Sequence, residues 1–255
     1  MHAPVEIAES AANMLARLRA RAPRVHCITN TVAQQYTANM LLAVGAVPSM
    51  TISPEEVASF VADADALLVN LGTFDAERRA AIDVAIRAAK AARMPWVLDP
   101  AFIDRAPARA EFARQLVGRA PAVVRLNTAE LAALSGGDPA GDAAARFAKT
   151  HGTVVALTGG VDRVTDGVRR AVIANGDPLM AAVTAMGCAG SALVCAALTV
   201  EPDAWLAAAA AVTALGVAGE VAAEEARGPG SFAGLIIDAL HGLDAATLRA
   251  RSRVS

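Results

Sequence analysis

A cysteine at an expected helix start is the first residue of this sequence to suggest chemistry. In the segment TAMGCAGSA, a strand-like run ends at Thr184, and a helix of small residues is expected to begin at Gly187. The N–H groups of residues 188–191 and the helix dipole would attract an anion such as phosphate and lower the pKa of a thiol toward neutrality. Cys188 is therefore either a base or charged group beside a phosphate, or a small side chain packed under the helix. Packing is the role expected for Cys27 and Cys195.

Polar or turn-forming residues end five of the apolar, strand-like runs. An Asn or Asp at such a place can simply cap the following helix. In an open parallel sheet, however, the carboxyl ends of the strands form the ligand crevice. The five endings together therefore favour a binding edge. They are Thr29–Asn30, Asn70 to Thr73, Asp99–Pro100, Asn127 with Glu130, and Thr158 to Gly160.

Alternating strand-like and helical segments must position these residues. Strand-like runs cover residues 25–28, 46–50, 66–71, 96–99, 122–126 and 153–158, and helical patterns cover 74–93 and 141–152. In the first helix Ala81, Ile82, Ala85 and Ala89 share a face, with Glu77, Arg78 and Lys90 expected to point outward. Such alternation predicts a mostly parallel sheet covered on both faces.

The pattern changes after Thr158. The turn signals TGG, TDG and NGD predict an antiparallel meander at the sheet edge, followed by helices over 187–198, 203–225 and 231–240. We expect one α/β domain over residues 1–255, built of three layers with a mostly parallel central sheet.

Composition excludes several function classes. With 55% hydrophobic and 19% charged residues the chain is not disordered, and a net charge of −2 without basic runs makes nucleic acid and membrane surfaces poor partners. No secretory signal is visible, and the apolar stretch 206–219 is too short to cross a bilayer. Three cysteines without a CxxC favour the reducing cytoplasm, and the histidines lack zinc-ligand spacing. Neither GxxxxGK[ST] nor GxGxxG is present, which disfavours the common nucleotide loops.

The sequence resembles the hydroxyethylthiazole kinases, a family of the ribokinase-like superfamily. The resemblance runs in order through VHCITNTVAQQYTANMLLAVGAVPSM, LLVNLGTF, VLDP, RLNTAEL, ALTGGVDRVTDG, VTAMGCAGSAL and GPGSF. It implies a ribokinase-like fold and transfer of the γ-phosphoryl group of ATP to the hydroxyl of 4-methyl-5-(2-hydroxyethyl)thiazole, with Mg²⁺, in thiamine biosynthesis and salvage. It also implies a homotrimer with the thiazole near a subunit interface.

The resemblance assigns a role to each matching residue. Met50, Asn30 and Ala185 would lie at the thiazole, Arg125, Thr158 and Gly187 would bind ATP, and Asp99 and Glu130 would serve the metal. Cys188 takes the position of the aspartate base of other ribokinase-like kinases. Each residue also has a plainer role: Arg125 as a surface cation, Glu130 and Asp99 as ends of local structure, Met50 as core, and Thr158 as a turn residue.

Three segments depart from the family pattern. DPAFIDRAPAR replaces a Gly-rich DPVGxGATxxR, Leu126 replaces the glycine after the arginine, and Ala185 replaces the first glycine of TGxGC. Each change puts a Cβ where the backbone is usually permissive. The outcomes left open are the usual substrate in a repacked pocket, another small heterocyclic alcohol, or a weakly active or non-catalytic ligand-binding relative.

Overall fold

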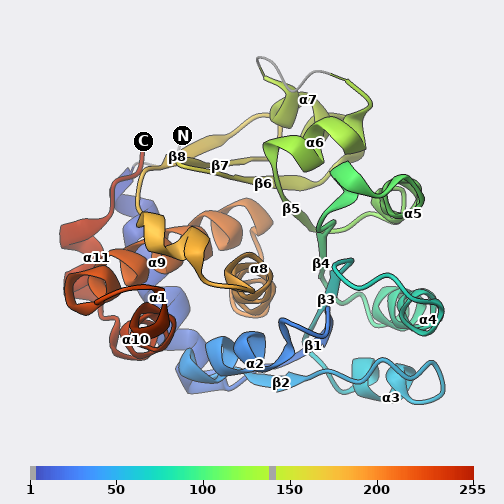
Figure 1. Cartoon of the computed structure of the whole chain (residues 1–255), viewed down its shortest axis with the longest axis horizontal. Helices are drawn as coiled ribbons and strands as arrows, with labels where there is room; N and C mark the ends of the chain where they lie inside the picture. Colours follow the sequence, from blue (N-terminus) through green and yellow to red (C-terminus); the bar gives the residue numbers. More distant parts are fainter. Residues whose placement is uncertain (1–3, 138–141) are drawn as a thin grey trace.

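A single mixed sheet runs through the middle of the molecule. In the computed structural model, which describes residues 4–137 and 142–255, this sheet has eight strands in the order β2-β1-β3-β4-β5-β6-β7-β8 (Figure 1). The pairs from β2 to β6 are parallel, whereas β7 and β8 add an antiparallel edge. The predicted sheet is confirmed. Its strands are β1 Arg24–Ile28, β2 Val47–Ser49, β3 Ala66–Asn70, β4 Trp96–Asp99, β5 Val123–Asn127, β6 Val154–Thr158, β7 Asp162–Thr165 and β8 Arg170–Ile173.

Helices cover both faces of the sheet, which gives the predicted three layers (Figure 1). One side carries α1 Pro4–Arg21, α2 Gln34–Ala43, α8 Met186–Ala197, α9 Ala204–Glu225, α10 Pro229–Gly242 and α11 Ala245–Arg251. The other carries α3 Val57–Ala62, α4 Ala76–Ala91, α5 Pro107–Val117, α6 Thr128–Ser135 and α7 Ala143–His151. Residue 141, where the α7 pattern was expected to begin, lies outside the described residues.

The strands hold the layers together because their side chains alternate between two cores. In β3, Ala66 and Leu68 pack with the α1, α2 and α8–α10 layer, and Leu67 and Val69 pack with the α3–α7 layer. Successive strand residues point to opposite faces, so a strand buried on both faces is apolar throughout. This explains the continuous apolar runs in the sequence.

Helix α4 shows both a confirmed prediction and an error. Its predicted apolar face is buried, but Arg78, which was expected to point outward, is only 4% exposed. The Arg78 Nε donates to the Thr29 carbonyl oxygen at 3.1 Å, and its guanidinium pairs with Asp75, the N-cap of α4. A backbone carbonyl left free just after β1 therefore draws this side chain inward.

Two other segments differ from expectation, whereas the helix expected over 203–225 is confirmed as α9. The strand-like run ending at Thr184 is instead a 3₁₀ helix, Pro178–Ala182, because Pro178 opens it and Asp177 caps the Leu179 N–H. Helix α8 begins one residue earlier than expected, at Met186. Helix α9 has 22 residues and is long and apolar enough to cross a membrane, yet 78% of its apolar window is buried inside the fold. It is the core helix against which α1, α8 and α10 pack.

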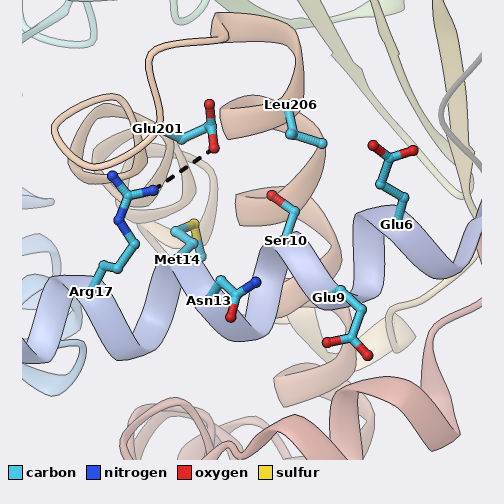
Figure 2. Close-up of a pocket in the computed structure, with 8 residues that line it drawn as sticks. All are labelled: Glu6, Glu9, Ser10, Asn13, Met14, Arg17, Glu201 and Leu206. Atoms are coloured by element: carbon cyan, nitrogen blue, oxygen red, sulfur yellow. Dashed lines mark ion pairs between the residues drawn. The ribbon is translucent and has the colours of Figure 1, made fainter.

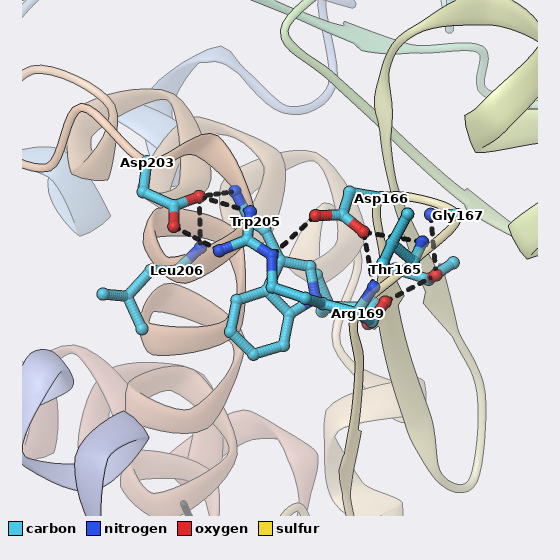
Figure 3. Close-up of polar contacts among 9 residues, drawn as sticks. Thr165, Asp166, Gly167, Arg169, Asp203, Trp205 and Leu206 are labelled. Atoms are coloured by element: carbon cyan, nitrogen blue, oxygen red, sulfur yellow. Dashed lines mark hydrogen bonds and ion pairs between the residues drawn. The ribbon is translucent and has the colours of Figure 1, made fainter. Parts of the chain in front are cut away.

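One arginine fixes the antiparallel edge to α9 (Figure 3). Arg169, in the β7–β8 turn, donates to both carboxylate oxygens of Asp203, the N-cap of α9, and to Asp166 at 2.7 Å. Its guanidinium carbon lies 4.8 Å from the centre of the Trp205 ring. The Trp205 Nε1 in turn donates to the Val164 carbonyl oxygen of β7 at 3.1 Å. The turn, the strand and the helix are thus joined at one point.

We therefore predict that Arg169→Ala lowers the free energy of unfolding by about 1–2 kcal/mol, because a partly exposed bidentate pair and a cation–π contact are lost together. Urea denaturation measures this change. Arg251→Ala, which removes an exposed pair with Glu224, is the matched control and should unfold like the wild type. Equal stability of both variants would contradict the prediction.

Candidate functional site

A cavity of about 570 Å³ lies at the carboxyl end of the parallel strands. All five polar strand endings contribute to its lining, with Asn30 after β1, Gly72 and Thr73 after β3, and Asp99 at the end of β4. Asn127 and Thr158 line it from β5 and β6, and residues 183–188 close the remaining side. The structure thus brings together at one edge residues that are far apart in the sequence.

The cavity collects every candidate site residue except Met50. Asn30, Asp99, Arg125, Glu130, Thr158, Ala185, Gly187 and Cys188 all line it. Met50 follows the edge strand β2, where its partly buried side chain packs against the hydrophobic core. Within the described residues of one chain, the structure does not place Met50 in the cavity.

The start of α8 forms one wall of the cavity. Ala185 precedes the helix with a left-handed backbone, φ 72°, and its carbonyl accepts the Ala189 N–H at 2.9 Å. The N–H groups of Gly187 and Cys188, in the first helical turn, therefore have no acceptor within the helix. An anion would meet these two groups, so of the donors at residues 188–191 expected from the sequence only that of Cys188 remains.

Cys188 is the third residue of α8, and its sulfur faces two asparagines. Asn30 Nδ2 lies 3.1 Å and Asn70 Nδ2 lies 3.3 Å from Cys188 Sγ. Burial, and secondarily the charge of Asp99, raises the pKa of the Cys188 thiol to about 12. The sequence-based expectation of a pKa near neutrality is therefore wrong, because desolvation of the sulfur outweighs the helix field. Cys27 and Cys195 are fully buried free thiols, as expected.

Arg125 connects β5 to the first turn of α8. One of its terminal nitrogens donates to the Gly187 carbonyl oxygen at 2.7 Å. The approach requires a glycine at position 190, since a Cβ there would lie 2.9 Å from the other terminal nitrogen of Arg125. Ser191, one turn further, donates to Asp99 Oδ2 at 2.8 Å. Arg125 is therefore a fixed, half-buried charge in the cavity wall and not a surface cation.

Two carboxylates face the same cavity. Burial raises the pKa of Asp99, against the attraction of Arg125 and the hydrogen bond from Ser191. Burial also raises the pKa of Glu130, against N–H bonds from Asn127 and Phe102, while the charge of Asp99 raises it further. A cation between them would relieve both penalties, and Mg²⁺ is commonly held by one or two carboxylates with phosphate oxygens. The donor set therefore fits Mg²⁺.

Glu130 also performs the structural task that the sequence left open. Its Oε2 accepts the Asn127 N–H and the Asn127 side chain accepts the Glu130 N–H, both at 2.9 Å, which forms a capping box on α6. Its Oε1 accepts the Phe102 N–H at 2.9 Å. The Thr158 hydroxyl donates to the Leu126 carbonyl oxygen at 3.3 Å. Local roles and a role in the cavity are thus compatible for both residues.

Sequence reasoning did not single out Phe102 or Ser191. Phe102 lines the cavity with a left-handed backbone, φ 61°, and a side chain that is 58% exposed. The signal for it was the replaced Gly-rich segment, where a left-handed position without glycine is costly. Ser191 is fully buried beside Asp99, and nothing in the segment CAGSA announced that contact.

A smaller cavity of about 250 Å³ lies along α1 (Figure 2). Glu6, Glu9, Ser10, Asn13 and Arg17 of α1 line it, together with Glu201. Its charged groups already have partners: Glu9 pairs with Arg249, and Arg17 lies 3.9 Å from Glu201. This cavity shares no lining residue with the larger one among the described residues.

Comparison with known proteins agrees with the fold and shows the family. The model of the hydroxyethylthiazole kinase family matches residues 15–246. A probable hydroxyethylthiazole kinase from Agrobacterium fabrum is 45% identical over 233 residues, covering 91% of this chain and 89% of that protein. A hydroxyethylthiazole kinase from Clavibacter sepedonicus is 44% identical over 244 residues, covering 91% and 89%.

Solved structures give the same result. The hydroxyethylthiazole kinase of Pyrococcus horikoshii superimposes with a TM-score of 0.92 at 35% identity, covering 97% of this chain and 98% of that one. The pyridoxal kinase of Staphylococcus aureus, at 17% identity with a TM-score of 0.64, covers 78% of this chain and 89% of that one and shares the fold. The fold is therefore ribokinase-like, and the chain belongs to the hydroxyethylthiazole kinase family.

Proposed function

We propose that this kinase transfers the γ-phosphoryl group of ATP to the hydroxyl of 4-methyl-5-(2-hydroxyethyl)thiazole, in thiamine biosynthesis and salvage. The observation that carries the proposal is the 570 Å³ cavity, which combines a helix start, a fixed guanidinium and a carboxylate pair. Phosphoryl transfer depends mainly on positioning and on charge neutralisation, and these groups supply both.

On the phosphate side, Arg125, Thr158 and Gly187 are proposed to bind ATP. Arg125 carries a positive charge, and its hydrogen bond to the Gly187 carbonyl oxygen, at 2.7 Å, fixes its position. The Gly187 N–H belongs to the first turn of α8, where the helix dipole also favours an anion. Asp99 and Glu130 are proposed to hold Mg²⁺, which would neutralise phosphate charge when bound.

On the acceptor side, Asn30, Ala185 and Cys188 are proposed to line the thiazole alcohol. The Cys188 sulfur receives two amide donors and has a pKa of about 12, so it is a thiol at neutral pH. Its proposed role is therefore to orient the hydroxyl, with a modest contribution to rate. Val183 and Met186 add apolar wall suited to a heterocycle.

Met50 is proposed to act at an interface between subunits. The family resemblance implies a homotrimer with thiazole near a subunit interface, and Met50 lies beside β2 at the end of the sheet. Two exposed apolar side chains, Leu42 and Val47, are near that edge and support an interface there. We propose that Met50 reaches the thiazole of a neighbouring copy. A cytoplasmic location is also proposed, which the three free thiols support.

The decisive experiment measures ADP release from Mg-ATP with and without the thiazole alcohol, alongside a panel of small heterocyclic alcohols that includes a hydroxymethylpyrimidine. We expect release that depends on the thiazole alcohol and stops when EDTA removes the divalent cation. Ligand-induced thermal stabilisation without ADP would instead indicate a binding protein. Release only with another alcohol would reassign the substrate.

The state of Cys188 gives a second prediction. Because its pKa is about 12, alkylation by iodoacetamide should be slow at pH 7.5 and rise about tenfold per pH unit up to that value. Cys188→Ala should keep ATP binding and lower kcat by less than about 100-fold, below the range of a lost general base. Fast alkylation at neutral pH, or an unchanged kcat, would contradict this role.

A third prediction concerns the contact between α8 and Arg125. Gly190→Ala places a Cβ 2.9 Å from a terminal nitrogen of Arg125, so it should displace the guanidinium and raise the KM for ATP. We expect about a tenfold rise, the size of one weakened charge-assisted hydrogen bond. Gly234→Ala in α10, which has nothing within 4 Å of the new Cβ, is the matched control. Circular dichroism verifies folding, and an unchanged KM in the Gly190 variant would refute the contact's role.

A further inference from the structure

We propose that Asn70 is a positioning residue of the phosphoryl-transfer site. Its side-chain amide holds the Cys188 sulfur at the cavity wall and links the acceptor side of the cavity to Asp99 on the phosphate side. The inference rests on the proposed function for the reaction it serves, while the contacts that carry it belong to the fold itself.

Asn70 occupies the last position of β3 and is fully buried. Its register partner across the parallel pair β3–β4 is Asp99. Partners in register on parallel strands point to the same face of the sheet, so the two side chains emerge together beneath the cavity. A neutral amide buried beside a carboxylate, with both at strand ends, needs hydrogen-bond partners that fix its orientation.

The backbone decides which way the Asn70 amide points. Its Oδ1 accepts the N–H of Gly72 at 2.9 Å and an N–H of Asn30 at 3.1 Å. A reversed amide would face the Gly72 N–H with another donor, which is unfavourable. Asn70 Nδ2 must therefore face the cavity, where it lies 3.3 Å from Cys188 Sγ.

Asn30 is fixed in the same manner. Its Oδ1 accepts the Ala33 N–H at 3.0 Å, which leaves Nδ2 to lie 3.1 Å from Cys188 Sγ. Gly72 is required by this arrangement, since a Cβ there would lie 2.7 Å from Asn30 Nδ2 and 2.9 Å from Asn70 Oδ1. Two amides of fixed orientation thus donate to one sulfur. The side-chain oxygen of Asn70 holds them together, because it accepts an N–H of Asn30.

Asn70 also reaches the phosphate side. Its register partner on β4 is Asp99, whose side chain emerges on the same face of the sheet. Asp99 Oδ2 accepts the Ser191 hydroxyl at 2.8 Å, and Ser191 Oγ lies 3.5 Å from a terminal nitrogen of Arg125. Asn70 therefore sets the position of Cys188, beside the acceptor hydroxyl, relative to the strand end that carries Asp99. Fixing both sides on one buried amide keeps the reacting groups in line, on which rate depends steeply.

The test measures kcat and KM for Asn70→Ala and Asn70→Asp, each alone and combined with Cys188→Ala. We expect the single variants to lower kcat by about 10- to 100-fold with both KM values within about threefold, as for loss of positioning. Because Asn70 acts through Cys188, its substitution should cost less than about threefold more in the Cys188→Ala background. If Asn70→Ala does not fold, the near-isosteric Asn70→Asp provides the same measurement.

The matched control is Thr153→Val. It removes a buried hydroxyl that donates to the Pro121 carbonyl oxygen at 2.8 Å, at the opposite end of β6 from the cavity. It should lower stability without lowering kcat. Fully additive losses in the double variants, or an equal loss of kcat in the control, would overturn the proposal.

A second readout separates this inference from the proposed function. The rate of Cys188 alkylation at pH 9.5 should fall about tenfold in Asn70→Asp, because an N–H donor that favours the thiolate is replaced by a carboxylate. Cys188→Ser verifies that the buried cysteines do not react. If the wild type releases no ADP with any alcohol, the proposed function fails while this rate still decides the role of Asn70. An unchanged rate would reject that role.

Discussion

The structure of the site depends on the contact between the Arg125 guanidinium and the first turn of α8. This contact is possible because position 190 is a glycine, and it brings a strand-borne charge to 2.7 Å from a helical carbonyl. It fixes where α8 begins relative to β5, and α8 also packs against β1, β3 and β4. The hydroxyl of Ser191 then reaches Asp99 at the end of β4, and the sulfur of Cys188 reaches Asn70 and Asn30 at the ends of β3 and β1. Without this contact the same residues would lie in the same region but not at fixed distances from one another.

Two opposing electrostatic effects meet at Cys188. The helix start and two amide donors favour a thiolate, while burial and the nearby Asp99 disfavour it, and burial prevails. The same burial raises the pKa of Asp99 and Glu130, so the cavity holds negative charge at a cost. A cation bound between the two carboxylates would lower this cost. This fits phosphoryl transfer, where positioning and charge neutralisation outweigh proton transfer.

Much of this architecture could be predicted from the sequence, because periodicity reports directly on burial. The apolar strand runs, the inner face of α4 and the polar strand endings were all placed correctly. The errors arose where a tertiary contact outweighs local pattern. Arg78 turns inward to a carbonyl just after β1, and Pro178 with Asp177 makes a 3₁₀ helix from an apolar run that resembles a strand. The pKa of Cys188 depends on how much protein covers the sulfur, which helix position alone does not reveal. Met50 was assigned by resemblance, and one chain leaves it outside the cavity.

Ala185 shows why the chain tolerates departures from the glycines of its family. A residue with a Cβ in the left-handed region costs about 1–2 kcal/mol relative to the ordinary backbone. A glycine would avoid that cost but would gain conformational freedom in the unfolded chain, which lowers stability by about 0.4–1 kcal/mol. The second term offsets only part of the first, so the alanine lowers stability by about 1 kcal/mol or less, which a folded domain tolerates. The alanine also stiffens the loop before α8, because a residue with a Cβ at φ 72° has fewer backbone conformations available than a glycine. The entrance to α8 is consequently stiffer than its length suggests, and less of the energy of ligand binding is needed to order it.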